Sequence, residues 1–250
     1  MQNNAKHTIY ENPAVKRALS GGANINALDA FKRANELTKS SFSVMAAASA
    51  IVLIIVMLVL IVSFNILGVP ITEYQNVAAE QRAVIDIVLV LLLSPLMAGL
   101  LMMGVDKARG HTPHVMHLFN WVKIAVVLAL GSLIASLLMQ LGISLFIVPG
   151  LYIAIATTFT LTLIADKKLN VLNAIVLSVR AVNRYLGQFI IFFLISILLF
   201  MIVGLTLFLG GIWLIPLYFN AKGILYVELF GNNDASEIES SPQQSSFFDA

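Results

Sequence analysis

Three histidines at intervals of three residues form the closest approach in this sequence to a metal-binding motif. They are His111, His114 and His117, in the segment His-Thr-Pro-His-Val-Met-His. Thr112 followed by Pro113 is suited to begin a helix, which would place the last two histidines on adjacent turns. A metal site needs further ligands, and Asp106 is the only carboxylate nearby. We therefore interpret the histidines as part of a solvated turn, with a metal site as the alternative.

Ionisable residues within apolar segments are the second group of candidates, because a charge inside a membrane is costly and usually functional. They stand near the ends of two apolar segments: Asp166, Lys167, Lys168, Lys222 and Glu228. Lysine can extend to the headgroup layer, so we interpret these five as boundary residues. No acidic residue falls at the middle of an apolar segment. That pattern argues against a proton- or ion-coupled pump.

Uncharged polar residues in the apolar segments have two interpretations. They are Ser132, Ser136, Gln140, Ser144, Thr157, Thr158, Thr160 and Thr162. Hydrogen bonding between helices is the simpler role, and a polar path for a solute is the alternative. The sequence has no cysteine, no Walker motif, no His-Glu-x-x-His and no Gly-x-Ser-x-Gly. We therefore expect no enzyme, and we assign no catalytic, cofactor-binding or metal-binding residue.

Composition defines the environment of these residues. Of 250 residues 59% are hydrophobic and only 11% are charged, against roughly 25% charged in a soluble domain. The mean hydropathy is +0.92. So few charges could not cover so large an apolar core in water, which excludes a soluble enzyme. A net charge of +2 is too small to indicate nucleic acid as a partner. The sequence predicts an all-α polytopic membrane protein.

The apolar blocks predict about six membrane spans. Residues 51–62 are all aliphatic or Met and favour insertion by roughly 4–7 kcal/mol. Two later blocks, 122–165 and 186–230, are each too long for one helix across a ~30 Å core. We expect them to reverse at Pro149-Gly150 and at Gly210-Gly211. The predicted spans are about 42–67, 83–105, 121–147, 150–165, 187–209 and 212–230. A re-entrant or interfacial segment is the alternative for the last.

Basic residues predict the orientation of the spans. Thirteen of the 15 lie in the segments that would share one side, whereas Arg82 alone lies on the other. Positive charge marks the cytoplasmic side, so both termini are expected there. The first 40 residues are polar and do not form a signal peptide. We expect residues 1–25 to be a polar tail, 26–230 the membrane domain and 231–250 an acidic, disordered tail.

Two cytoplasmic segments, 26–42 and 170–186, have the periodicity of amphipathic helices. Their apolar faces are Leu28, Phe31, Ala34, Leu37 and Phe42 in the first, and Leu172, Ile175, Val179, Val182 and Leu186 in the second. We predict helices lying in the membrane interface, Arg180 and Arg184 facing the headgroups; packing of the second apolar face on the bundle is the alternative. Both segments begin Asn-x-Leu-x-Ala, which indicates either an internal duplication or a chance likeness.

Several short motifs resemble a known family. They are Val148-Pro149-Gly150, an apolar span ending at Asp166, the stretch 174–178, and Lys107-Ala108-Arg109-Gly110 followed by Leu118-Phe119. With these, residues 26–230 resemble the YciC-like family of uncharacterised bacterial inner-membrane proteins, or a closely related six-span family. The resemblance implies a six-helix bundle in the bacterial inner membrane. That family has no established activity, so it transfers no site residue and no cofactor.

Together these features favour a non-enzymatic integral inner-membrane protein that acts in membrane organisation or as the partner of another membrane component. Its partners would be the lipid bilayer and either another membrane protein or itself. The alternative is a small-solute transporter or permease subunit, motivated by the helix breaks at Pro95, Pro149-Gly150 and Pro216. A cavity with convergent polar groups at mid-depth would favour transport, and a solid apolar bundle would favour the first interpretation.

Overall fold

The computed structural model describes residues 12–67, 78–207 and 209–231, which form helices and turns without strands. The α-helices are α2 (Pro13–Ser20), α3 (Ala27–Leu67), α4 (Ala79–Ala108), α5 (Ala125–Leu145), α6 (Ile147–Ala156), α7 (Thr160–Lys167), α8 (Val171–Arg184), α9 (Leu186–Leu205) and α10 (Gly211–Phe230). Two 3₁₀ helices, η2 (Val115–Phe119) and η3 (Val122–Ile124), precede α5. The expected all-α class is confirmed for these residues. The predicted acidic tail lies almost wholly outside them.

Five helical segments are long and apolar enough to cross a membrane: Ala27–Ile66, Ile85–Ala108, Val115–Leu145, Ile147–Lys167 and Leu186–Leu205. Only 17% of the most apolar part of Val115–Leu145 is buried in the protein, and only 22% of that of Leu186–Leu205. Large apolar side chains therefore face outward over much of the described surface. Such a surface is unsuited to water and suited to lipid. The chain is a polytopic membrane protein by helix composition.

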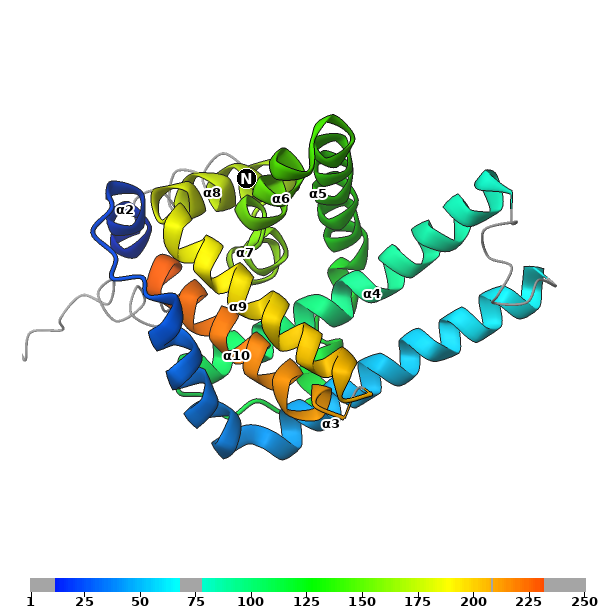
Figure 1. Cartoon of the computed structure of the whole chain (residues 1–250), viewed down its shortest axis with the longest axis horizontal. Helices are drawn as coiled ribbons and strands as arrows, with labels where there is room; N and C mark the ends of the chain where they lie inside the picture. Colours follow the sequence, from blue (N-terminus) through cyan, green and yellow to red (C-terminus); the bar gives the residue numbers. More distant parts are fainter. Residues whose placement is uncertain (1–11, 68–77, 208, 232–250) are drawn as a thin grey trace, which may run out of the picture.

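Helix α10 is not one of these five segments, although the sequence predicts a span at 212–230. Asn220, Lys222 and Glu228 lower its hydropathy. The helix lies instead at the centre of the bundle, against α3 and α4 (Figure 1), and 12 of its 20 residues are buried. Gly223 packs so closely on α4 that an added Cβ would lie 2.3 Å from the backbone of Gly104. A helix covered by protein does not need a uniformly apolar surface.

Helix α3 joins the first amphipathic segment to the first predicted span. Asn26 caps it, accepting a hydrogen bond from the Asp29 backbone N–H at 3.1 Å, and the backbone leaves helical geometry at Ser41. Residues before this kink pack on the bundle, where the Phe31 and Phe192 rings stack with centroids 5.0 Å apart. Leu28, predicted on the apolar face, is exposed. The apolar face of the first amphipathic segment therefore packs partly on the protein, at Phe31, and is partly exposed, at Leu28.

The reversal predicted at Pro149-Gly150 is wrong by a few residues. Helix α5 ends at Leu145, Phe146 is extended, and α6 begins at Ile147. Pro149 therefore lies in the first turn of α6, where a missing N–H costs nothing. Gly150 serves close packing instead: an added Cβ there would lie 2.2 Å from the Ile143 side chain. The break before Gly211 is confirmed, since α9 ends at Leu205 and α10 begins at Gly211.

The predicted span 150–165 is divided into α6 and α7. Ser178, from α8, stabilises the break between them. Its hydroxyl donates a hydrogen bond to the Ala156 carbonyl at 2.7 Å and accepts one from the Phe159 N–H at 3.2 Å. Broken helices persist in membranes only where other protein groups satisfy the freed backbone. Ser178 is fully buried, and its hydroxyl satisfies the backbone groups of Ala156 and Phe159.

Helix α8 confirms the amphipathic helix at 170–186 but corrects its environment. Ile175 and Val182, expected in the acyl boundary, are buried within the protein, where α8 contacts α2, α5, α6 and α7. Val179 is partly buried. The alternative, packing on the bundle, therefore holds for Ile175 and Val182, whereas Leu172 of the same predicted face is exposed. Local periodicity identifies an apolar face but does not distinguish a protein partner from a lipid one.

Helix α2 occupies part of the predicted polar tail. Asn12 caps its start by accepting a hydrogen bond from the Ala14 N–H at 2.9 Å, and Gly21 ends it in the left-handed region. Val15 and Ala18 are fully buried against the ends of α8 and α10. Two apolar residues one turn apart are enough to attach so short a helix.

Candidate functional site

The most completely buried charges of the described residues form an ion pair between α4 and α7. Arg109, which ends α4, donates Nη1–H and Nη2–H to the two carboxylate oxygens of Asp166 at 2.9 and 2.8 Å. The two side chains are 5% and 3% exposed. The bidentate geometry is the strongest that these groups adopt. Asp166 was predicted as a boundary residue, and the structure places it instead at the centre of a buried cluster.

Three further groups complete this cluster. The Tyr226 hydroxyl, on α10, donates to Asp166 Oδ2 at 2.8 Å, and Lys167 Nζ lies 3.5 Å from the same oxygen. Arg109 Nη2–H also donates to the Gly231 carbonyl at 3.4 Å. The cluster therefore links the ends of α4, α7 and α10. Sequence reasoning missed Arg109 and Tyr226 because their partner is distant in the chain.

The electrostatics of the cluster indicate that its charges stabilise the packing of the helices. Burial alone would lower the pKa of Arg109, but the hydrogen bonds and the negative charge of Asp166 outweigh it, and the pKa is raised. The guanidinium thus stays charged. The Asp166 carboxylate is surrounded by donors from three directions. The Asp166 carboxylate therefore links α7 to α4 and α10 through these contacts.

Polar contacts also attach α10 to the first half of α3. Asn220 Nδ2–H donates to Thr38 Oγ1 at 2.9 Å, and both residues are fully buried. Arg33 pairs with Glu228. Lys222 Nζ lies 5.9 Å from the centre of the Tyr218 ring. Lys222 and Glu228, predicted at the membrane boundary, thus both have partners within the protein.

The histidine segment lies beside α4. His117 Nδ1 is 3.6 Å from Asp106 Oδ2, and the rings of His114 and His117 are 5.7 Å apart. The His111 backbone N–H donates to the Asp106 carbonyl at 2.9 Å. Within residues 12–67, 78–207 and 209–231, no three His, Cys, Asp or Glu side chains are grouped as metal ligands. The contacts of this segment are those between His117 and Asp106 and between the two histidine rings.

The uncharged polar residues of the spans differ in their contacts. Ser132 Oγ–H donates to Ser94 Oγ at 2.9 Å, which links α4 to α5, because the single hydroxyl hydrogen of Ser94 goes to the Val90 carbonyl. The hydroxyls of Ser144 and Thr157 donate to backbone carbonyls of their own helices. The predicted hydrogen bonding between helices is thus confirmed for Ser132.

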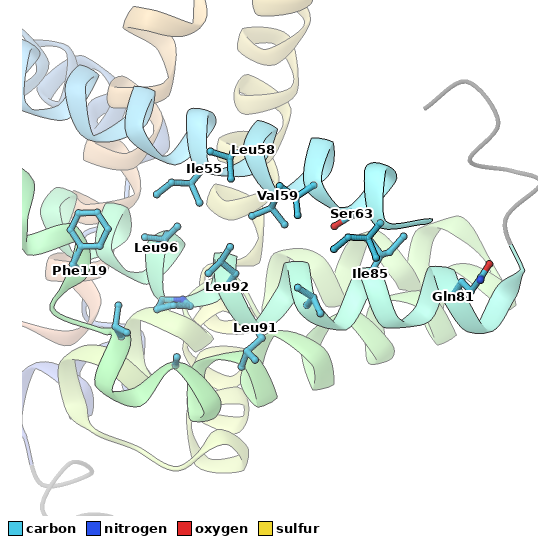
Figure 2. A pocket seen from close by; sticks show the side chains of 16 residues that line it. Ile55, Leu58, Val59, Ser63, Gln81, Ile85, Leu91, Leu92, Leu96 and Phe119 are labelled. Atoms are coloured by element: carbon cyan, nitrogen blue, oxygen red, sulfur yellow. The ribbon is translucent and has the colours of Figure 1, made fainter. Parts of the chain in front are cut away.

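An apolar groove lies between α3 and α4. The two helices project together beyond α9 and α10 (Figure 1), and the groove between them has a volume of about 750 Å³. Its lining consists of Ile55, Leu58, Val59, Val62, Ser63, Ile66, Gln81, Ile85, Val88, Leu91, Leu92, Pro95, Leu96, Phe119, Val122 and Ala125. Among these described residues only Ser63 and Gln81 carry polar side chains, and Figure 2 shows both toward the end opposite Phe119.

Pro95 marks the inner part of this groove. It lies inside α4 and cannot donate a backbone hydrogen bond, while the Ser94 hydroxyl donates to the Val90 carbonyl at 2.5 Å. Beyond Pro95, Leu96 and Leu100 join a buried cluster with Met45 and Phe219. The groove therefore ends where α3 and α4 enter the packed bundle. Its shape and lining suit an elongated apolar guest.

Compared with models of known protein families, with curated proteins and with solved structures, the chain matches none of them. The resemblance to the YciC-like family stays a prediction. Two features of the described residues bear on function: the buried ion pair of Arg109 and Asp166, and the apolar groove between α3 and α4.

Proposed function

We propose that this chain is a non-enzymatic protein of the bacterial inner membrane that binds another membrane component within the bilayer. One observation carries the proposal: the apolar groove between α3 and α4. Ligand sites are concave and mostly apolar, with a few polar groups that fix orientation. A groove of this kind on two helices that project from the bundle suits binding in the membrane plane. The biological role would be membrane organisation or partnership with another membrane component.

The alternative, a small-solute transporter, has weaker support. A solute path needs convergent polar groups near the middle of the membrane. The polar groups of the groove, Ser63 and Gln81, are instead at one end (Figure 2). The break between α6 and α7 is of the kind that lines transport sites, but Ser178 bonds the backbone groups that it frees. Binding therefore accounts for more of the geometry than transport.

The topology that accompanies this proposal has six crossings and cytoplasmic termini, in line with the YciC-like resemblance. Helix α10 supplies the sixth crossing. Its 20 residues would extend about 30 Å, enough for the hydrocarbon core. Its polar side chains contact α3 and α7, so they need not meet lipid. The excess of basic residues near Arg109 and Lys167 over the opposite side supports the orientation.

Site-specific photocrosslinking in native membranes tests the proposed binding. A photoreactive phenylalanine would replace Leu58 or Val88, which line the groove. The matched controls are Met57 and Ile87, which adjoin them in sequence, are similarly exposed and do not line it. We expect the groove positions to give a shared adduct, lipid or protein, that the controls lack. Identical adducts at all four positions would contradict a specific binding function.

A further inference from the structure

We infer that the groove between α3 and α4 binds the acyl chains of one phospholipid from the external leaflet, with the headgroup end at Ser63 and Gln81. This inference rests on the proposed function and identifies its ligand. It also uses the proposed orientation, in which residues 68–77, between α3 and α4, are external. Three features of the groove favour a phospholipid over a membrane-spanning helix as the occupant.

The first feature is the length of the groove. Along α3 the lining extends from Ile55 to Ile66, and along α4 from Gln81 to Leu96. At 1.5 Å per residue these stretches measure about 16 and 22 Å. One leaflet is half of the ~30 Å hydrocarbon core, about 15 Å. A groove of this length accommodates the acyl chains of one leaflet, whereas a spanning helix would need a surface about 30 Å long.

The second feature is the closed inner end. Phe119 lies at that end of the groove (Figure 2), and α3 and α4 then pack together around Leu96 and Met45. Leu118, next to Phe119, is fully buried, and its carbonyl oxygen would be 2.5 Å from a Cβ added at Gly99. A helix crossing the whole membrane could not continue past this contact. A chain that ends near the middle of the bilayer would end here.

The third feature is the distribution of polarity. Of the described lining residues fourteen are apolar, and the two polar ones, Ser63 and Gln81, lie toward the end opposite Phe119 (Figure 2). Gln81 is exposed and Ser63 partly buried. Their hydroxyl and amide groups can hydrogen-bond the ester or phosphate oxygens of a phospholipid. The groove thus has the polarity of an amphiphile with its polar end outward.

Native mass spectrometry of the full chain tests this inference. The protein would be reconstituted in vesicles of palmitoyl-oleoyl phosphatidylethanolamine and phosphatidylglycerol and then extracted in a mild detergent. Val88→Trp fills the groove from α4, and Ile87→Trp is the matched control on the same helix. We expect one retained phospholipid per chain in the unmodified protein and in the control. Retention should fall about tenfold in V88W, because overpacking of this size opposes the bound chain.

Equal phospholipid retention in both variants, or none in the unmodified protein, would overturn the inference. If V88W fails to fold, a phospholipid with a photoreactive acyl chain can be used on the unmodified protein. Its adducts should map to lining residues such as Leu58 and Leu92 and not to Met57 or Ile87. Adducts spread evenly over the helices would also overturn it. A groove-specific polypeptide adduct in native membranes would refute the lipid and leave the proposed binding function standing.

Discussion

Replacing Arg109 with methionine should destabilise the protein strongly, because it would leave Asp166 buried without its main counter-charge. The side chains of the pair are 5% and 3% exposed, so water cannot replace the lost contacts. Breaking a buried pair by removing one partner costs about 3–5 kcal/mol. We expect R109M to lower the free energy of unfolding by about 3 kcal/mol, since Tyr226 and Lys167 still contact the carboxylate.

Unfolding in mixed micelles with increasing dodecyl sulfate would measure this loss. The matched control is Arg33→Met, which breaks the pair with Glu228; there the arginine side chain is 52% exposed, and we expect about 1 kcal/mol or less. The double variant R109M/D166L should lose less than R109M alone, because it leaves no buried carboxylate without its main counter-charge, and of the two cations only Lys167 then loses its contact with Asp166. Equal losses for R109M and R33M would refute the proposed structural role of the cluster.

The sign of the pH dependence follows from the same pair. Because the pKa of Arg109 is raised, its contribution to stability is present below the ordinary pKa of arginine. It is lost only as the pH rises through the raised pKa. Deprotonation of Arg109 therefore should not weaken the protein under ordinary conditions.

Three further predictions concern the packing of the bundle. Ser178→Ala should cost about 1–3 kcal/mol in the same unfolding assay, because it leaves two buried backbone groups between α6 and α7 unpaired; a loss near zero would contradict the bridging role. Gly223→Ala should cost about 1–3 kcal/mol through overpacking on α4, whereas Gly187→Ala, with nothing within 4 Å of the added Cβ, should be tolerated. Single cysteines that replace Ile175 and Arg180 should differ in accessibility. The cysteine at 175 should be shielded from aqueous reagents and from lipid-soluble quenchers, whereas the cysteine at 180 should be labelled from water. Quenching at 175 from lipid would contradict the packing of α8 on the bundle.

Composition and periodicity were sufficient for the helices themselves. The aliphatic run in α3, the two amphipathic segments and the break before Gly211 are local features, and the structure contains each of them. Asn26 and Asn170 stand at the starts of α3 and α8, a position that asparagine favours, and both accept a hydrogen bond from the backbone three residues later. Local chemistry determines local structure in these cases.

The remaining features depend on contacts between distant residues. Pro149-Gly150 has the composition of a turn but lies in the first turn of a helix, because Gly150 allows α6 to approach Ile143 of α5. Asp166 resembles any charge at the end of a span until Arg109, 57 residues earlier, is placed beside it. No periodicity reveals such a pair. The groove likewise depends on the distance between α3 and α4. The sequence of either helix alone does not reveal that distance.

Electron cryomicroscopy of the chain in a phospholipid nanodisc would show whether the groove holds a phospholipid. We expect elongated density between α3 and α4, beginning near Ser63 and Gln81 and ending at Phe119, along the lining residues. Density for a membrane-spanning helix in that place would contradict the lipid as occupant. A groove closed by direct packing of α3 on α4 would contradict the proposed binding function as well.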